Sequence, residues 1–329
     1  MQKKNSVRWA ILGAGKIAHK FAQDFPATQG GALVAVAARD TARAQTFADQ
    51  YGIPLVYTYE ALYNSTEVDA VYIATTHNFH YEQGLQCLQH GKAVLCEKPI
   101  TINDAQFREL VAAAKTADVF LMEAMWMYFL PALHQAKAWL DGGRIGKLVA
   151  IQTDFGFAMP FEPEGRLYNP ELAGGALLDL GVYTLAFAAY FANTKCTSLV
   201  ASGVLGTTGV DETTGMLLTY GDLPASLLVS IRTRLRNKAL LLGETGYIEI
   251  PYFWKAPSVT LYNAEHEVVE TVTDDRKTWG YNFEIQEATD AILRGEGESN
   301  VMPHAKSNEL QGLMTEVRRQ IGLKYPMED

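Results

Sequence analysis

The sequence predicts an α/β protein in which a doubly wound parallel sheet is followed by an α+β domain with a mainly antiparallel sheet. Up to about residue 125, short apolar runs alternate with helix-like segments, which is typical of βαβ units and a parallel sheet. Beyond that point, strand-like segments follow one another with turn signals between them, which favours antiparallel pairing. We therefore expect one domain over residues 1–125 and another over residues 126–329.

The elements of the first domain follow from short apolar runs that end at glycine or polar residues. The first run stops at Gly13, and a helix-like segment follows it directly. Because strands and helices alternate, the crossovers should be right-handed. The expected strands are Val7–Leu12, Leu33–Ala38, Ala70–Thr75, Ala93–Cys96 and Val119–Glu123, and the expected helices are Lys16–Phe25, Thr41–Tyr51, His80–His90 and Asn103–Thr116.

The second domain combines a few helices with a series of strands. Turn signals divide the stretch from Ser198 to Thr273 into several strands, which we expect to pair into one sheet. Leu148–Phe157 alternates in the manner of a half-buried strand. The expected helices are Pro131–Leu140, Gly175–Phe191, Tyr281–Leu293 and His304–Ile321.

Composition argues against several classes of function. The formal net charge of −9 argues against a nucleic-acid or anionic-membrane partner. The apolar runs are far shorter than the roughly 20 residues of a membrane span, and the N-terminus lacks the pattern of a signal peptide. The three cysteines form no C-x-x-C pair, which favours reduced thiols and a cytoplasmic location.

A phosphate-binding loop lies between the first strand and the first helix. Gly13-Ala14-Gly15-Lys16-Ile17-Ala18 matches G-x-G-x-x-G/A at this junction. Gly13 makes the tight turn, Gly15 lets the backbone approach a pyrophosphate, and Ala18 permits close packing of helix and strand. The helix start at Lys16 and Ile17 offers free N–H donors and a partial positive charge. The pattern predicts a Rossmann dinucleotide site.

The end of the second strand indicates which dinucleotide binds. An NAD site usually has an acidic residue there for the ribose 2′-hydroxyl, but this sequence has Arg39. A guanidinium can bind a 2′-phosphate through two hydrogen bonds, and Arg43 adds charge one helical turn later. The next residue, Asp40, either caps the following helix or allows NAD as well. We expect NADP, with NAD as the weaker alternative.

Four motifs together resemble the Gfo/Idh/MocA oxidoreductase family. They are GAGKIA near the start, Glu97-Lys98-Pro99 after a strand end, MEAMW at 122–126 and GGALLDLGVY at 174–183. The resemblance runs nearly end to end and is greatest to the branch of dimeric dihydrodiol dehydrogenase, NADP-dependent D-xylose dehydrogenase and glucose–fructose oxidoreductase. It implies a Rossmann domain followed by an open, mainly antiparallel sheet through which two copies often dimerise.

The resemblance also implies which residues are catalytic. Lys98 matches the essential lysine of the family. Many members carry Asp-x-x-x-His on a helix, whereas this sequence has Asp179 and Tyr183, a departure that matches the dihydrodiol and xylose dehydrogenase branch. From the residues alone, Asp179 and Tyr183 lie one helical turn apart on one face. A nearby Lys98 ammonium would lower the pKa of Tyr183, so that Tyr183 acts as general base or general acid, while Asp179 holds the substrate or fixes the geometry.

Other polar and aromatic residues complete the expected site. After the third strand, Asn78 and His80 are expected either near the nicotinamide or as caps of the next helix. The histidines lack H-E-x-x-H spacing and a third ligand, so no metal is expected. The cofactor set is Gly13, Gly15, Lys16, Ile17, Ala18, Arg39, Arg43, Thr75, Asn78, His80, Glu97 and Lys98, and the substrate pocket set is Trp126, Phe155, Arg166 and Trp254.

These observations lead to one main functional hypothesis and one alternative. The main hypothesis is an NADP-dependent dehydrogenase that acts on a small polyol, an aldose or a trans-dihydrodiol, or reduces a dicarbonyl. The partners are then a small-molecule substrate and a second copy of the chain, with no nucleic acid or membrane. The alternative is a non-catalytic NADP(H)-binding regulator of the same fold, against which intact Lys98, Asp179 and Tyr183 argue.

Overall fold

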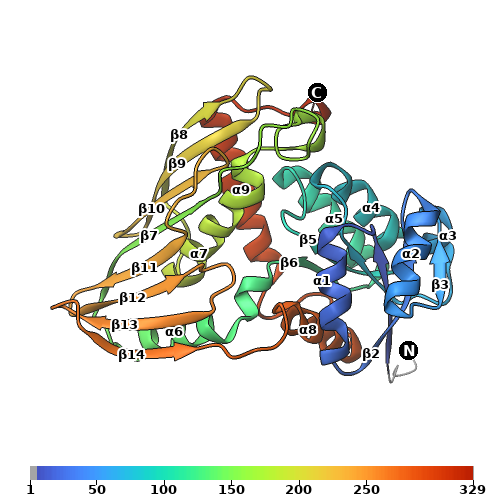
Figure 1. Cartoon of the computed structure of the whole chain (residues 1–329), viewed down its shortest axis with the longest axis horizontal. Coiled ribbons are helices and arrows are strands. Elements are labelled where there is room, and N and C mark those ends of the chain that lie inside the picture. Colours follow the sequence, from blue (N-terminus) through green and yellow to red (C-terminus); the bar gives the residue numbers. More distant parts are fainter. Residues whose placement is uncertain (1–5, 329) are drawn as a thin grey trace. The chain divides into compact units, whose positions relative to one another are not determined.

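The chain forms two compact units in a computed structural model that describes residues 6–328 (Figure 1). The first unit runs as far as Trp126 and also includes Arg276–Asn308, and the second contains Met127–Asp275 and the residues from Glu309 onward. The sequence alone placed residues 276–308 with the second domain. Asp24 and Thr289 explain their place in the first unit: Asp24 accepts the N–H group of Tyr281 at 2.8 Å, and Thr289 accepts Nε1–H of Trp9 at 3.1 Å.

The first unit contains a six-stranded parallel sheet, which confirms the predicted fold class. The strand order is β3-β2-β1-β4-β5-β6, so the direction of winding reverses between β1 and β4. Ligands bind such sheets at the carboxyl ends of the strands beside this switch point. The strands are β1 (Val7–Leu12), β2 (Gly31–Ala37), β3 (Leu55–Tyr57), β4 (Ala70–Ile73), β5 (Ala93–Glu97) and β6 (Leu121–Ala124).

Helices cover both faces of this sheet. Right-handed crossovers place the helices that follow β1 and β2 on one face and those that follow β4 and β5 on the other. The helices are α1 (Lys16–Asp24), α2 (Thr41–Tyr51), α3 (Tyr59–Asn64), α4 (His77–Gln89), α5 (Asp104–Ala117) and α8 (Tyr281–Arg294), with a short 3₁₀ turn at Phe25–Ala27. The prediction omitted β3 and α3, which are only three and six residues long.

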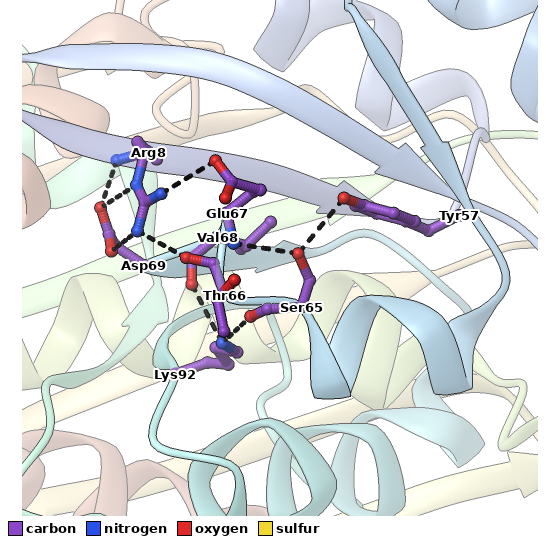
Figure 2. Close-up of polar contacts among 8 residues, drawn as sticks. All are labelled: Arg8, Tyr57, Ser65, Thr66, Glu67, Val68, Asp69 and Lys92. Carbon is purple, nitrogen blue, oxygen red and sulfur yellow. Dashed lines mark hydrogen bonds and ion pairs between the residues drawn. The ribbon is translucent and has the colours of Figure 1, made fainter.

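A polar network fastens the amino ends of β1, β4 and β5, at the opposite edge of the sheet from the switch point (Figure 2). The guanidinium of Arg8 donates to both carboxylate oxygens of Asp69, at 3.0 and 2.9 Å. The ammonium of Lys92, which is almost fully buried, donates to the carbonyls of Ser65 and Val68. Because charge-assisted bonds are the strong ones, this network fixes the strand starts and leaves the carboxyl ends for function.

The second unit is built on an eight-stranded, mainly antiparallel sheet, which confirms the predicted fold class. Its order is β14-β13-β12-β11-β7-β10-β9-β8, and β7 and β10 form the one parallel pair. The strands are β7 (Leu148–Gly156), β8 (Ser198–Leu205), β9 (Asp211–Tyr220), β10 (Leu223–Ser230), β11 (Lys238–Gly243), β12 (Gly246–Pro251), β13 (Ser258–Asn263) and β14 (Val268–Thr273).

Helices α6 (Pro131–Asp141) and α7 (Val182–Ala192) lie on one face of this sheet (Figure 1). One π-helical turn, Leu177–Gly181, leads into α7. Pro170–Ala192 is long and apolar enough to be a candidate membrane span, but 89% of its most apolar window is buried inside the protein. Short 3₁₀ turns are Trp126–Phe129, Pro170–Leu172 and Pro326–Glu328, and α9 (His304–Ile321) begins in the first unit and continues in the second.

The other face of the sheet carries exposed apolar side chains at its β8–β10 end. Val200, Val204 and Leu217 are each 62% exposed, and Leu228 is 39% exposed. Val200 lies directly opposite Leu217 in the register of β8 and β9. We call Val200, Val204, Leu217 and Leu228 the apolar face.

The core of the first unit contains a buried acid whose charge state should make stability depend on pH. Glu284 of α8 is fully buried, and neither carboxyl oxygen has a hydrogen-bond partner among residues 6–328. Burial, aided by the charges of Glu97 and Asp24, raises the pKa of Glu284 well above its usual range. The folded protein therefore keeps a proton on Glu284 at pH values where the same carboxyl group of the unfolded chain has already lost it. Rising pH thus lowers the free energy of unfolding.

We predict that Glu284→Gln removes this dependence, because the amide has a similar shape and does not titrate. The free energy of unfolding of the variant should exceed that of the wild type by a margin that grows from pH 5 to pH 8. The expected gain is at least about 1.4 kcal/mol, which corresponds to one pKa unit. Urea unfolding at four pH values measures the margin, and a margin independent of pH would contradict the prediction.

Candidate active site

The first strand-to-helix turn has the shape of a pyrophosphate cradle. Gly13 has a φ of +104°, and a Cβ there would lie 2.9 Å from the carbonyl oxygen of Ala74, so only glycine fits. A Cβ on Gly15 would lie 3.7 Å from the same carbonyl oxygen, which is an ordinary contact distance. No side chain of the described residues caps α1, and the N–H groups of Lys16 and Ile17 can therefore bind a phosphate.

Charged residues lie beside this cradle at the end of β2. Arg39 and Asp40 are exposed. Asp40 accepts the N–H groups of Ala42 and Arg43 at 2.9 and 3.2 Å, so it caps α2, which is one of the two roles left open by the sequence. Nε of Arg43 donates to the carbonyl of Ala14 at 3.0 Å, which holds the guanidinium next to the glycine turn. A cavity of about 370 Å³ here is lined by Ala14, His19, Asp40, Ala42, Arg43, Thr46, Phe47 and Gln50.

The Lys98 turn, residues 97–100, is held by buried acids on both sides of Lys98. The Lys98–Pro99 peptide bond is cis. Glu97 accepts the hydroxyl of Tyr72 at 2.5 Å and the N–H of Lys98 at 3.3 Å. Glu123 of β6 accepts the N–H of Ile100 at 3.0 Å. The backbone that carries Lys98 is therefore fixed by two carboxylates from neighbouring strands.

His80 of α4 holds the same turn from a third direction. Its ring is fully buried, with Nδ1 2.8 Å from the carbonyl of Pro99 and Nε2 3.2 Å from that of Thr75. Burial lowers the pKa of His80, and the two carbonyl contacts oppose that shift. The expectation that Asn78 or His80 caps α4 is wrong: the N-cap residue is Thr76, no side chain among residues 6–328 caps the helix, and Thr76 donates its hydroxyl to Asn78. His80 instead ties the ends of β4 and β5 together.

Glu123, which holds the Lys98 turn, was not predicted as part of the candidate site. Burial raises its pKa to about 7, while the nearby Ser307 and the N–H of Ile100 act in the opposite direction. The available signal was an acid inside an otherwise apolar strand, because such a group needs a partner.

In the second unit, Arg166 forms an ion pair with Asp179. The guanidinium of Arg166 donates to the two carboxylate oxygens at 3.0 and 3.3 Å, a bidentate geometry. Asp179 lies on the π turn Leu177–Gly181 and Tyr183 in the first turn of α7, so the expected single α-helix begins as a wider turn. The sequence placed Arg166 in the substrate pocket, and its partner in the structure is the acid that we expected to be catalytic.

Tyr183 is nearly buried within a cluster of aromatic rings. Its ring centroid lies 5.7 Å from that of Phe155, in an edge-to-face arrangement. Phe155 stacks on Trp254 with centroids 3.9 Å apart, and Phe253 meets Phe155 edge to face. Two of the four expected pocket residues, Phe155 and Trp254, therefore share one aromatic wall with Tyr183.

The expected site residues divide between the two units. Trp126 belongs to the first unit, where its ring stacks on Tyr281 at 4.9 Å. Lys98 and all the expected cofactor residues also belong to the first unit, and Asp179, Tyr183, Arg166, Phe155 and Trp254 belong to the second. The first unit thus carries a nucleotide cradle and a lysine on a rigid turn, while the second carries an aromatic wall, a tyrosine and an ion pair.

Family models match both parts of the chain. One described as an oxidoreductase family with an NAD-binding Rossmann fold matches residues 7–125, and a GFO/IDH/MocA C-terminal domain matches residues 133–249. Curated relatives named trans-1,2-dihydrobenzene-1,2-diol dehydrogenase are similar over nearly the full length. The Danio rerio protein is 37% identical over 338 residues (98% of this chain, 99% of the relative), and the Homo sapiens protein is 35% identical over 335 residues (98% and 99%).

Solved structures agree with these matches. KijD10, a 3-ketoreductase from Actinomadura kijaniata in complex with NADP and TDP-benzene, superposes with a TM-score of 0.86 at 26% identity, covering 96% of this chain and 98% of that one. An aldose-aldose oxidoreductase from Caulobacter crescentus shares the fold with a TM-score of 0.86 at 22% identity, covering 96% and 97%. The glycine cradle, the lysine turn and these matches together establish that this chain is an enzyme of the Gfo/Idh/MocA oxidoreductase family.

Proposed function

We propose that the protein is an NADP-dependent dehydrogenase that transfers a hydride between NADP(H) and a small polyol, aldose or trans-dihydrodiol. The observation that carries the proposal is the Lys98 turn, which Glu97, Glu123 and His80 hold at the carboxyl edge of the sheet. A residue presented there on rigid backbone lies where ligands bind in this class of sheet. The relatives named as dihydrodiol dehydrogenases support an alcohol or diol as the hydride donor.

In the proposed oxidation, the carbinol carbon loses a hydride and its hydroxyl loses a proton. NADP+, when bound at the glycine cradle, would supply the hydride acceptor. The phenolic oxygen of Tyr183 takes the proton as general base and returns it as general acid in the reverse direction. Lys98 orients the cofactor and the substrate through hydrogen bonds from its ammonium. Asp179, paired with Arg166, holds the substrate hydroxyl through the acceptor positions of its carboxylate.

The second unit's aromatic wall limits the class of substrate. Phe155 and Trp254 stack on each other and are buried beside Tyr183. The surroundings of Tyr183 are therefore apolar and aromatic, which suits a substrate with a ring, such as a sugar or an arene. The Arg166–Asp179 pair adds hydrogen-bonding groups for hydroxyls. A ring that bears adjacent hydroxyl groups satisfies both features, and this description includes aldoses and trans-dihydrodiols.

For the cofactor we propose NADP in preference to NAD. Arg39 stands where an NAD site has an acid, and Asp40 is engaged as the cap of α2. Arg43 is fixed beside the cradle by its bond to Ala14. The solved 3-ketoreductase from Actinomadura kijaniata is itself a complex with NADP, which supports the same preference.

We also propose that two copies of the chain associate through the apolar face. Four exposed apolar side chains on neighbouring strands are an unusual feature for a surface in contact with water. A two-fold arrangement would place the same surface of each copy against the other and bury both.

The proposed catalytic roles predict a severe loss of activity for each of two substitutions. Lys98→Met and Tyr183→Phe should each lower NADP+ reduction at least about a hundredfold, since each removes a group in contact with the reacting atoms. Absorbance at 340 nm is followed with D-xylose, D-glucose and trans-1,2-dihydrobenzene-1,2-diol, and Lys147→Met, at an exposed surface pair, is the control. Full activity of Tyr183→Phe would refute its role, and wild type that binds NADPH yet turns over no substrate would favour the regulator.

Cofactor preference predicts a selective effect of the two arginines. Arg39→Ala and Arg43→Ala should each raise the KM for NADP+ about tenfold, the equivalent of one lost charge-assisted bond, and leave that for NAD+ almost unchanged. Arg108→Ala, on the surface of α5 and paired with Asp104, serves as control. An equal rise for both cofactors would show that the arginines do not recognise the 2′-phosphate.

Association through the apolar face predicts a change of mass on one substitution. Wild type should elute with twice the mass of the chain in size-exclusion chromatography with light scattering, and Leu217→Lys should elute as a monomer because it would bury a lysine charge. Val268→Lys, at an equally exposed valine on the edge strand β14, should stay dimeric. A Leu217→Lys protein that remains dimeric places the interface elsewhere.

A further inference from the structure

Asp211, at the start of β9, makes contacts that the proposed reaction does not explain. Its side chain is fully buried. One carboxylate oxygen accepts the N–H of Leu177 at 2.9 Å and the hydroxyl of Thr214 at 2.7 Å. Leu177 is the first residue of the π turn that carries Asp179 and leads to Tyr183. A carboxylate from a distant strand therefore caps the helix on which the proposed catalytic residues lie.

The backbone before this helix is shaped to admit Asp211. Gly175 has a φ of +118°, and a Cβ there would lie 2.2 Å from the other carboxylate oxygen of Asp211. A Cβ on Gly174 would lie 2.7 Å from the carbonyl oxygen of Leu167. Two consecutive glycines are needed because the carboxylate and the Arg166–Leu167 backbone both approach the chain closely at this point.

The same turn is bonded to the loop that carries Arg166 and to the C-terminal segment. The N–H of Gly175 donates to the carbonyl of Leu167 at 2.8 Å. The hydroxyl of Tyr325, which is buried, donates to the carbonyl of Gly174 at 2.6 Å. Arg166 directly precedes Leu167, and Asp179 follows Gly175 within the next helical turn. Both members of the ion pair are therefore close in sequence to backbone that is fixed by these bonds.

We propose that Asp211 is a positioning residue of the active site, which sets the start of the catalytic helix and with it the placement of Asp179 and Tyr183. The inference rests on the proposed roles of those two residues. Burial raises the pKa of Asp211 to about 6, while its bonds to Thr214 and to backbone N–H groups act in the opposite direction. The carboxylate is therefore ionised at neutral pH, where an anion at a helix start is most favourable.

The matched control is Asp24, which caps a helix in the first unit as Asp211 does in the second. It is also buried, and its carboxylate accepts the N–H groups of Gly280 and Tyr281 at 2.9 and 2.8 Å, at the start of α8. Asp211→Ala and Asp24→Ala each remove a buried carboxylate that caps a helix. The two variants should lose similar amounts of stability, but only the first should disturb the proposed catalytic residues.

The experiment compares kcat, substrate KM, NADPH affinity and Tm for wild type, Asp211→Ala, Asp211→Asn, Thr214→Val and Asp24→Ala. We expect Asp211→Ala to lower kcat at least about tenfold, because small misplacements of reacting groups are costly, with NADPH affinity unchanged. Asp211→Asn, which keeps an acceptor for Leu177, should recover most of that loss. Thr214→Val, which removes one bond to Asp211 with little change of shape, should have a kcat between those of Asp211→Ala and Asp211→Asn.

Each outcome decides for or against the inference. If Asp24→Ala lowers kcat as much as Asp211→Ala for the same loss of Tm, Asp211 contributes general stability only, and the inference fails. It also fails if Asp211→Ala folds and keeps its kcat. Should Asp211→Ala not fold, a kcat of Thr214→Val equal to that of wild type overturns the inference in the same way. Full activity of Tyr183→Phe would instead refute the proposed function, so the two failures are distinguishable.

Discussion

The turn at Gly13 is the constraint on which the first unit depends. Its N–H bonds to the carbonyl of Ala37 at the end of β2, and its Cα approaches the carbonyl of Ala74 after β4 so closely that no Cβ fits. The ends of three adjacent strands are thereby brought together, at the point where the winding of the sheet reverses. The switch point and the phosphate cradle are thus the same piece of backbone. The Arg8–Asp69 network secures the opposite edge of the sheet.

In both units, buried carboxylates that accept backbone N–H groups hold the segments that carry the proposed catalytic residues. Glu123 accepts from Ile100 beside Lys98, and Asp211 accepts from Leu177 before Tyr183. Burial costs a carboxylate its hydration, which is why the pKa of Glu123 rises to about 7 and that of Asp211 to about 6. The N–H bonds offset part of that cost. These bonds prevent the backbone that donates them from shifting independently of the strand that carries the carboxylate.

Hydrophobic patterns sufficed for most of the fold, because the strands of the first unit are short continuous apolar runs and most helices bury one face. They failed for Leu55–Tyr57, whose three half-buried residues carry no period. They predicted helices α8 and α9, but not that residues 276–308 belong to the first unit, because their contacts with that unit span most of the chain. The glycine cradle could be located because it follows a strand end directly, and Lys98 could be located because its motif resembles that of the Gfo/Idh/MocA family. The pairing of Arg166 with Asp179, and the role of Glu123 at the Lys98 turn, depend on tertiary contacts that no local pattern contains.

Hydride transfer requires the reacting atoms to be held close to their productive geometry, and each unit meets that requirement with its own anchors. His80 and Glu123 hold the turn that carries Lys98, and Asp211 with the Gly174–Gly175 turn holds the start of the helix that carries Tyr183. The aromatic wall is coupled to the second set of anchors, because Phe155 packs edge to face against Tyr183. A change in that wall should therefore alter the placement of Tyr183 as well as the ring that the proposed site accepts.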